Sequence, residues 1–276
     1  MKALILAAGQ GKRLQPLTQD TPKTLLNISG TTILEYQLVT LASCGIREVV
    51  LIGGFRVEKL KDYAQRYIAL HGLDLKLTVI NNKEYDITNN LYSLWLAREE
   101  MTTDFVVVNG DNVFERGALA AMVKAQDVTA AVAIHKNPSY DDEDMKVRLQ
   151  GSRVVEISKS VSNSLADGES IGLRLFKNRG VAAFRYALDM AMVEDVSRNA
   201  FFVKAIQHMV DAGHPVEAID VTAFQYGELD FMDDLKQLEM EMAGMMKQVI
   251  TMHTNPAGLY AQTHRIFPAI RVKNAG

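Results

Sequence analysis

Apolar residues recur along the chain at two spacings, and their alternation predicts helices and strands that follow one another in turn. In residues 33–43 the apolar positions 34, 38, 41 and 42 lie on one face of a helix, and Gly45 provides a stop signal. The apolar run EVVLIGG that follows is typical of a buried strand. A second helical pattern extends from about Val57 to His71, and residues 73–79 then alternate between apolar and polar side chains, which predicts a strand with one buried face.

The remainder of the chain continues this alternation. NNLYSLWLA predicts a helix that begins near residues 88–90, and DFVVVNGDN, TAAVAIHK and GESIGLRLFK predict strands. MKVRLQGSRVVEIS predicts a hairpin that turns at Gly151. Helices from Asn178 and over residues 201–209, a late strand in PVEAIDV and a Met-rich helix beyond Asp230 complete the pattern. We therefore expect a three-layer α/β fold with a mixed, mainly parallel central sheet.

Composition narrows the classes of function. A net charge of −3 over 276 residues argues against a general binder of nucleic acid or of anionic membranes. The single cysteine, Cys44, excludes an intrachain disulfide and a cysteine-based zinc site, which fits a reducing compartment. No segment resembles a membrane span or a signal peptide, so we expect a cytoplasmic protein. The Met-rich segment 240–252 is expected to cover the core, with a self-association surface as the alternative.

The opening stretch LILAAGQGKRLQPLTQDTPKTLL carries the first candidate chemistry. An apolar strand runs into a turn at residues 7–11, where Gly9 and Gly11 have no Cβ to block a close approach of backbone N–H groups to a polyphosphate. Three cations follow the turn, namely Lys12, Arg13 and Lys23. A dinucleotide-binding turn is the alternative, but the third glycine of that motif is missing and prolines interrupt the following segment.

The ordered residues LxAAGxGxRLxPLTxxxPKxLL, followed by ILEYQL, resemble the signature of the nucleotidyltransferase family that joins an NTP to a phosphomonoester. The resemblance implies a Rossmann-like nucleotidyltransferase domain over residues 1–240, with residues 241–276 as an appended C-terminal helix and tail. It implies that Arg13 and Lys23 are the catalytic cations, Arg13 on the triphosphate and Lys23 on the phosphates of both partners. The predicted nucleotide-binding residues of this stretch are Leu6, Ala7, Ala8, Gly9, Gly11 and Lys12.

Two aspartates are candidate metal ligands. Asp111 in NGDN follows a predicted strand, and a carboxylate beside a polyphosphate is what Mg²⁺ requires, although such an Asp is often only a turn former. The family resemblance implies a second Asp late in the chain, in a pattern that Glu228-Leu229-Asp230 resembles. We therefore predict an Mg²⁺ site at Asp111 and Asp230, with Asp233 or Asp234 as the alternatives to Asp230.

The segment EYDITNNLYSLWLA resembles the phosphocholine cytidylyltransferase branch of the family. Its polar residues are predicted to bind the nucleotide, and because amides both donate and accept hydrogen bonds they suit cytosine. These residues are Thr88, Asn89, Asn90 and Ser93.

The pattern of the same branch continues in DEDMKV, ISK and GESIG. It implies that Lys146 and Lys159 hold the phosphate of an acceptor and that Glu169 binds its hydroxyl or amine. The alternative for the two lysines is that they are exposed charges of the hairpin.

Aromatic residues that could enclose a quaternary ammonium group do not form a clear choline cage. Tyr140, Tyr186, Phe201 and Phe202 are the candidates, but Phe201 and Phe202 have helical spacing and are expected in the core. We therefore expect transfer of CMP from CTP to phosphocholine, 2-aminoethylphosphonate or a similar small phosphate or phosphonate. The alternatives are a sugar-1-phosphate nucleotidyltransferase that uses UTP, dTTP or GTP, and a catalytically silent nucleotide-binding regulatory module.

Overall fold

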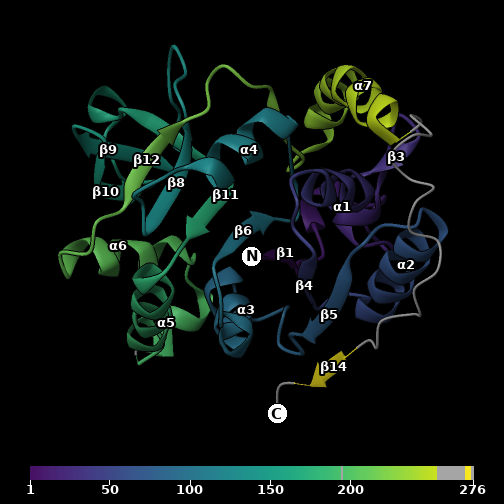
Figure 1. The fold of residues 1–276 in the computed structure, drawn as a ribbon, viewed down its shortest axis with the longest axis horizontal. Coiled ribbons are helices and arrows are strands. Elements are labelled where there is room, and N and C mark those ends of the chain that lie inside the picture. The colour runs from purple at the N-terminus through teal and green to yellow at the C-terminus, as the bar shows by residue number, and fades with distance from the viewer. Residues whose placement is uncertain (194, 254–270, 275–276) are drawn as a thin grey trace.

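A mixed sheet of ten strands forms the centre of the protein in a computed structural model, which describes residues 1–193, 195–253 and 271–274 (Figure 1). The loops that follow β1 and β6 leave the sheet at one rim, because β1 pairs in parallel with both β6 and β4. In spatial order the strands are β14 (Arg271–Asn274), β5 (Lys76–Asn81), β4 (Glu48–Gly53), β1 (Lys2–Ala7), β6 (Phe105–Asn109), β11 (Gly168–Phe176), β8 (Ala130–His135), β12 (Glu217–Asp220), β10 (Arg153–Ser158) and β9 (Lys146–Gln150).

Most strands run in one direction, which confirms the predicted mixed, mainly parallel sheet. The first five strands of the order are parallel, and β12 is parallel to β8. The exceptions are β11, which is antiparallel to β6 and β8, and β10, which is antiparallel to β12 and β9. The β9–β10 pair is the predicted hairpin, and Gly151 in its turn has a positive φ of 65° that favours glycine.

Helices cover both faces of the sheet and make the structure three-layered (Figure 1). One face is covered by α1 (Ile33–Ser43), α2 (Val57–Leu70) and α4 (Arg116–Lys124), and the other by α3 (Asn90–Leu96), α5 (Arg179–Ala191) and α6 (Val203–Asp211). The long helix α7 (Met232–His253) packs on α1. In the described part of the chain, no helix is both long and apolar enough to cross a membrane.

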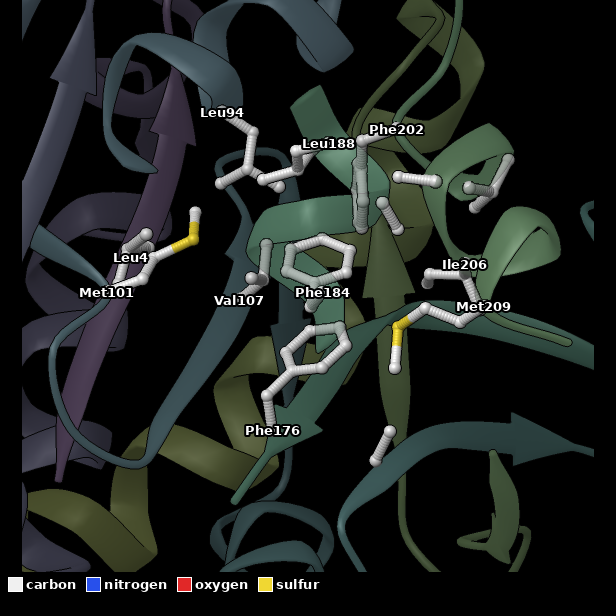
Figure 2. Close-up of a cluster of buried hydrophobic side chains, with 14 of the residues drawn as sticks. Leu4, Leu94, Met101, Val107, Phe176, Phe184, Leu188, Phe202, Ile206 and Met209 are labelled. Atoms are coloured by element: carbon white, nitrogen blue, oxygen red, sulfur yellow. The ribbon is translucent and has the colours of Figure 1, made fainter. Parts of the chain in front are cut away.

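Aromatic side chains hold β11 to α5 and α6 (Figure 2). Phe176 of β11 stacks on Phe184 of α5 with ring centroids 3.9 Å apart, and Phe105 of β6 lies 5.0 Å from Phe176. Phe202, which immediately precedes α6, belongs to the same cluster and is 1 % exposed. This packing places the start of α6 beside β11, where the cavity described below is found.

Three segments differ from the sequence prediction. The strand expected over residues 73–79 is β5, which begins at Lys76 and is buried on both faces, because parallel neighbours and helices enclose it. Helix α4 was not predicted, because its first turn contains Gly117, a poor helix former. Glycine is required at this position, since a Cβ there would lie 2.1 Å from the ring of Phe224. The predicted boundary after residue 240 falls inside α7.

Two short strand pairs lie outside the main sheet. β2 (Asn27–Ile28) pairs with β3 (Thr31–Thr32) just before α1. β7 (Asn112–Phe114) pairs antiparallel with β13 (Tyr226–Glu228), and its register sets Glu228 opposite Asn112. This second pair brings Glu228, which is far along the chain, next to the loop that follows β6.

Candidate active site

A cavity of about 850 Å³ opens at the rim where β1 and β6 end. The cavity is lined by the loop after β1, the start of α3, β11, residues 141 and 143–145, and the start of α6. All the predicted site residues except Lys12 and Lys146 line this cavity. The tertiary structure thus gathers residues from the first turn, from the middle and from the late segment of the chain into one site.

The loop after β1 depends on glycine at position 11 and is held against the end of β6. Gly11 has a φ of +71°, and a Cβ at this position would lie 3.1 Å from Cβ of Lys23. The hydroxyl of Thr18 donates to the carbonyl of Gly11 at 2.7 Å, which fixes the turn. Gly110 donates its N–H to the carbonyl of Leu6 at 2.9 Å, so the ends of β1 and β6 are in direct contact.

Lys23 links the two predicted aspartates. Its Nζ donates to Asp111 Oδ2 at 2.7 Å and to Asp230 Oδ1 at 2.8 Å. Burial by itself lowers the pKa of Lys23, but the negative charges of Asp111 and Asp230 outweigh burial and raise this pKa above its ordinary value. Lys23 is therefore a permanent cation at the centre of the site.

Glu228 completes a three-carboxylate cluster. Asp111, Glu228 and Asp230 each offer one oxygen, and these oxygens lie within 4.8 Å of one another. Asp111 Oδ1 is buried and accepts no hydrogen bond from the described residues. Burial first, and then the charges of Asp111 and Asp230, raise the pKa of Glu228 well above its ordinary value. Such a set of crowded oxygen donors fits a hard divalent cation.

Arg13 lines the cavity, and its guanidinium forms no ion pair with a described carboxylate. The guanidinium lies 4.8 Å from the ring centroid of Phe231. Lys12 is exposed and lines an adjacent smaller hollow instead of the main cavity. Of the three cations that follow the turn, only Arg13 and Lys23 therefore face the main cavity.

The polar residues at the start of α3 are held by hydrogen bonds that leave amide donors available. Asn89 Oδ1 accepts from the N–H of Asn90 at 2.8 Å, and Asn90 Oδ1 accepts from the N–H of Phe202 at 2.7 Å. The amide nitrogens of both side chains make no hydrogen bond with described residues. The site accordingly presents donors to a ligand here, while the acceptor oxygens are occupied.

Asn82 organises the same segment, although the sequence analysis did not single it out. Its buried amide nitrogen donates to Thr88 Oγ1 at 3.1 Å and to Ser93 Oγ at 2.9 Å. The hydroxyl of Thr88 in turn donates to the carbonyl of Glu84 at 2.6 Å. Thr88 and Ser93 thus support the cavity wall through Asn82, a residue whose role depends on contacts that no local motif reveals.

The predicted acceptor-binding residues have different environments. Glu169 lines the cavity, and its Oε2 accepts hydrogen bonds from Tyr226 and from Asn137, both at 2.7 Å. Lys159 also lines the cavity, and its ammonium pairs with Glu143 at 2.8 Å. Lys146 does not line it: its side chain is buried, and its Nζ donates to the carbonyl of Asp141 at 2.5 Å. The alternative of an exposed hairpin charge is therefore wrong for Lys146.

The aromatic candidates separate in the same way. Phe202 is in the core as predicted, but Phe201 is 44 % exposed and lines the cavity, so its predicted core position is wrong. The reason is that α6 begins only at Val203, and the helical spacing does not extend back to Phe201. Tyr140 and Tyr186 do not line the cavity.

Comparison with known proteins identifies the class. Residues 2–145, just over half of the chain, match the nucleotidyl transferase family, and the chain belongs to this family.

Relatives and solved structures extend the similarity beyond the matched segment. The chain is 28 % identical over 259 residues to the CTP:phosphoglutamine cytidylyltransferase of Campylobacter jejuni, covering 86 % of this chain and 98 % of that protein. It is 36 % identical over 112 residues to the choline-phosphate cytidylyltransferase of Streptococcus pneumoniae, covering 41 % of this chain and 45 % of that protein. The inositol-1-phosphate CTP transferase from T. maritima has the same fold, with a TM-score of 0.74, 22 % identity and coverage of 89 % of this chain and 96 % of that one.

Proposed function

We propose that this enzyme transfers CMP from CTP to a small phosphomonoester or phosphonate and releases pyrophosphate. The observation that carries the proposal is the contact of Lys23 with both Asp111 and Asp230 at the rim where the glycine-containing loop ends. A cation and a carboxylate cluster at such a loop suit a triphosphate and its metal ion.

In the proposed reaction an ionised oxygen of the acceptor attacks the α-phosphorus of CTP in line. A P–O bond forms to the acceptor while the bond from the α-phosphorus to the bridging oxygen breaks, and both electrons leave with pyrophosphate. The attacking oxygen needs no general base because it is already ionised near neutral pH. Catalysis then consists of positioning and charge neutralisation, in which Arg13 contacts the triphosphate and Lys23 contacts the phosphates of both partners.

Three carboxylates would hold a divalent cation, for which Mg²⁺ is the proposed identity. Asp111, Glu228 and Asp230 supply the oxygens, and the unpartnered Oδ1 of Asp111 supports this assignment. When bound, the ion neutralises charge on the triphosphate. Lys23 shares two of these carboxylates and so keeps them in position.

The preference for CTP is supported by the start of α3 and by the relatives. The free amide N–H groups of Asn89 and Asn90 suit the carbonyl oxygen and ring nitrogen of cytosine, which both accept hydrogen bonds. The names of the two relatives from Campylobacter jejuni and Streptococcus pneumoniae describe cytidylyl transfer, to phosphoglutamine and to choline phosphate respectively. These acceptors share a phosphoryl group and an amino or quaternary ammonium group.

A panel of nucleotides tests the proposal. The purified chain is incubated with Mg²⁺, a mixture of small phosphate and phosphonate acceptors, and CTP, UTP, dTTP or GTP in turn, and pyrophosphate release is measured. We expect CTP to give the largest kcat/KM. Preference for UTP, dTTP or GTP would instead indicate a sugar-1-phosphate nucleotidyltransferase, and release with none of the four would indicate a silent nucleotide-binding module.

A matched pair of lysine variants locates the chemistry. Lys23→Met is expected to reduce kcat by at least about 100-fold, because a preorganised donor to a developing charge is removed. Lys76→Met removes the same group from a lysine side chain that is 57 % exposed and lies outside the cavity, and it is expected to leave kcat unchanged. Equal activity of the two variants would exclude Lys23 from the catalytic machinery.

A further inference from the structure

Arg174 is a buried cation in the cavity wall that the proposed reaction does not use. It lies on β11 opposite Val107 of β6, two residues before Asn109 at the strand end. At about 3.3 Å per residue this depth is roughly 7 Å below the rim. The side chain is 2 % exposed and nevertheless lines the cavity, so its guanidinium belongs to the deep part of the cavity.

Most of the guanidinium's hydrogen-bonding capacity is unused. Its Nη2 donates to Ser170 Oγ at 3.0 Å, and the described residues provide no hydrogen-bond partner for Nε or Nη1. The guanidinium lies 5.0 Å from the ring centroid of Phe202, which limits its movement. A buried donor without a partner is destabilising, and more so when it is charged. A ligand group that accepts hydrogen bonds would remove this cost.

The guanidinium is charged at neutral pH and is not neutralised by direct contact. Burial lowers the pKa of Arg174 to about 10, and the negative charges of Glu228, Asp111 and Glu169 oppose this fall. Arg174 makes no ion pair with these or other described residues. The free donors and the positive charge therefore favour an anionic group on the ligand.

The cavity that Arg174 lines also contains a protein carboxylate with an unused acceptor oxygen, that of Glu169. Arg174 contacts Ser170, and Ser170 follows Glu169, whose carboxylate also lines the cavity. Both hydrogen bonds of Glu169 reach Oε2, so Oε1 has no partner among the described residues. The cavity thus offers a cation without an ion-pair partner among the described residues and a half-satisfied carboxylate whose charge acts on that cation.

We propose that Arg174 binds a carboxylate of the acceptor while Glu169 binds its ammonium group, so that the acceptor is a phosphate or phosphonate of an amino acid. The inference rests on the proposed function and names its substrate class. A carboxylate fits better than a second phosphate, because three protein carboxylates near Arg174 disfavour a dianion beside it. The transferred group remains at the rim with Arg13 and Lys23.

Acceptor pairs that differ by one carboxylate test this inference. O-phospho-L-serine is compared with phosphoethanolamine, 2-amino-3-phosphonopropionate with 2-aminoethylphosphonate, and O-phospho-L-homoserine with 3-aminopropyl phosphate. Both kcat/KM with CTP and the dissociation constant by calorimetry are measured. We expect the carboxylate-bearing member of the best pair to be favoured by about 10- to 100-fold in both measurements.

Variants at position 174 assign the preference to the guanidinium. Arg174→Met, of similar volume, is expected to abolish the preference while phosphoethanolamine and CTP bind within about 3-fold of wild type, and Arg174→Lys to restore part of it. Arg148→Met, at a half-exposed arginine of β9 outside the cavity, is the control and should keep the preference. The unchanged affinity for CTP verifies that each variant is folded.

The outcomes separate the inference from the proposed function. If CTP is used but no pair favours its carboxylate member, or if Arg174→Met keeps the preference, the inference is wrong and the cytidylyltransferase function stands. If no nucleotide is turned over, the function fails, and calorimetry still decides whether Arg174 selects carboxylates. Equal binding of the members of every pair by the wild type would overturn the inference in either case.

Discussion

At the scale of single residues, the site depends on close contacts around Gly110 that leave no space for a Cβ atom. Gly110 lies between β6 and Asp111, and a Cβ there would lie 2.5 Å from the carbonyl oxygen of Leu6 and 2.8 Å from Cγ2 of Thr24. Leu6 and Thr24 both line the cavity, and Thr24 is the neighbour of Lys23. The glycine of NGDN is therefore required for the close contact of two strand ends, and not only for a turn.

We expect Gly110→Ala to destabilise the protein by about 1 to 3 kcal/mol, as overpacked interiors commonly do, and to lower CTP turnover because Asp111 is displaced. Urea denaturation and pyrophosphate release measure the two effects. Gly9→Ala is the control for stability: a Cβ at Gly9 would meet no atom within 4 Å, so the free energy of unfolding should change by less than about 0.5 kcal/mol. A Gly110→Ala protein as stable as the wild type would contradict the steric argument.

At the scale of elements, one side chain joins two helices that are distant in sequence. Asn90 is the first residue of α3, and its Oδ1 accepts from the N–H of Phe202 immediately before α6. This hydrogen bond positions Phe201 and Phe202 at the cavity, while the amide nitrogen of Asn90 makes no hydrogen bond with a described residue. Asn90 thus links the start of α3 to the start of α6 at the cavity.

Asn90→Ala is expected to lower the free energy of unfolding by about 0.5 to 1.5 kcal/mol and to raise KM for both CTP and the acceptor. Thr32→Ala is the comparison variant, with a similar expected loss in the free energy of unfolding. Thr32 caps α1, accepting from the N–H of Glu35 at 3.1 Å, and its loss should cost about 1 kcal/mol. Because Thr32 lies outside the cavity, its variant should keep both KM values. If the two variants shifted KM alike, the change would reflect stability alone.

At the scale of the whole molecule, α7 packs on the body of the protein beside the cavity. Leu238 and Met245 of α7 are 1 % exposed and pack with Tyr36 of α1 and Val113 of β7 in one hydrophobic cluster. Leu238 also lines the cavity, and Asp230 lies just before the helix. The first half of α7 therefore belongs to the structure that holds the carboxylates.

Leu238→Ala is expected to cost about 2 to 5 kcal/mol, the usual loss when a buried leucine is truncated. Met240→Ala, on the same helix but 67 % exposed, should change the free energy of unfolding by less than about 0.5 kcal/mol. Denaturation curves of the two variants provide the comparison. A small effect of Leu238→Ala would mean that α7 unfolds independently, as an appendage does.

Local patterns were sufficient for much of the fold. The capping box and apolar face of α1, the apolar runs of β1, β4 and β6, and the Gly151 hairpin are each specified by neighbouring residues. The opening motif likewise predicted Arg13 and Lys23 together, because the turn and both cations belong to one continuous stretch of sequence, and both residues line the cavity. By contrast, β5 and Phe201 were misjudged, because their burial depends on neighbouring strands and on where a helix begins.

The sequence by itself determined that this rim carries nucleotidyl transfer chemistry, since short stretches of sequence are enough to show the glycine-containing loop, the cations that follow it and the strand-end aspartate. Only the tertiary structure decided which charges meet. The β7–β13 pair brings Glu228 to Asp111, and β11 places Arg174 in the cavity wall beside Phe202. These partners are far apart in sequence, and burial and charge pairing act through space, so no local pattern could assign them.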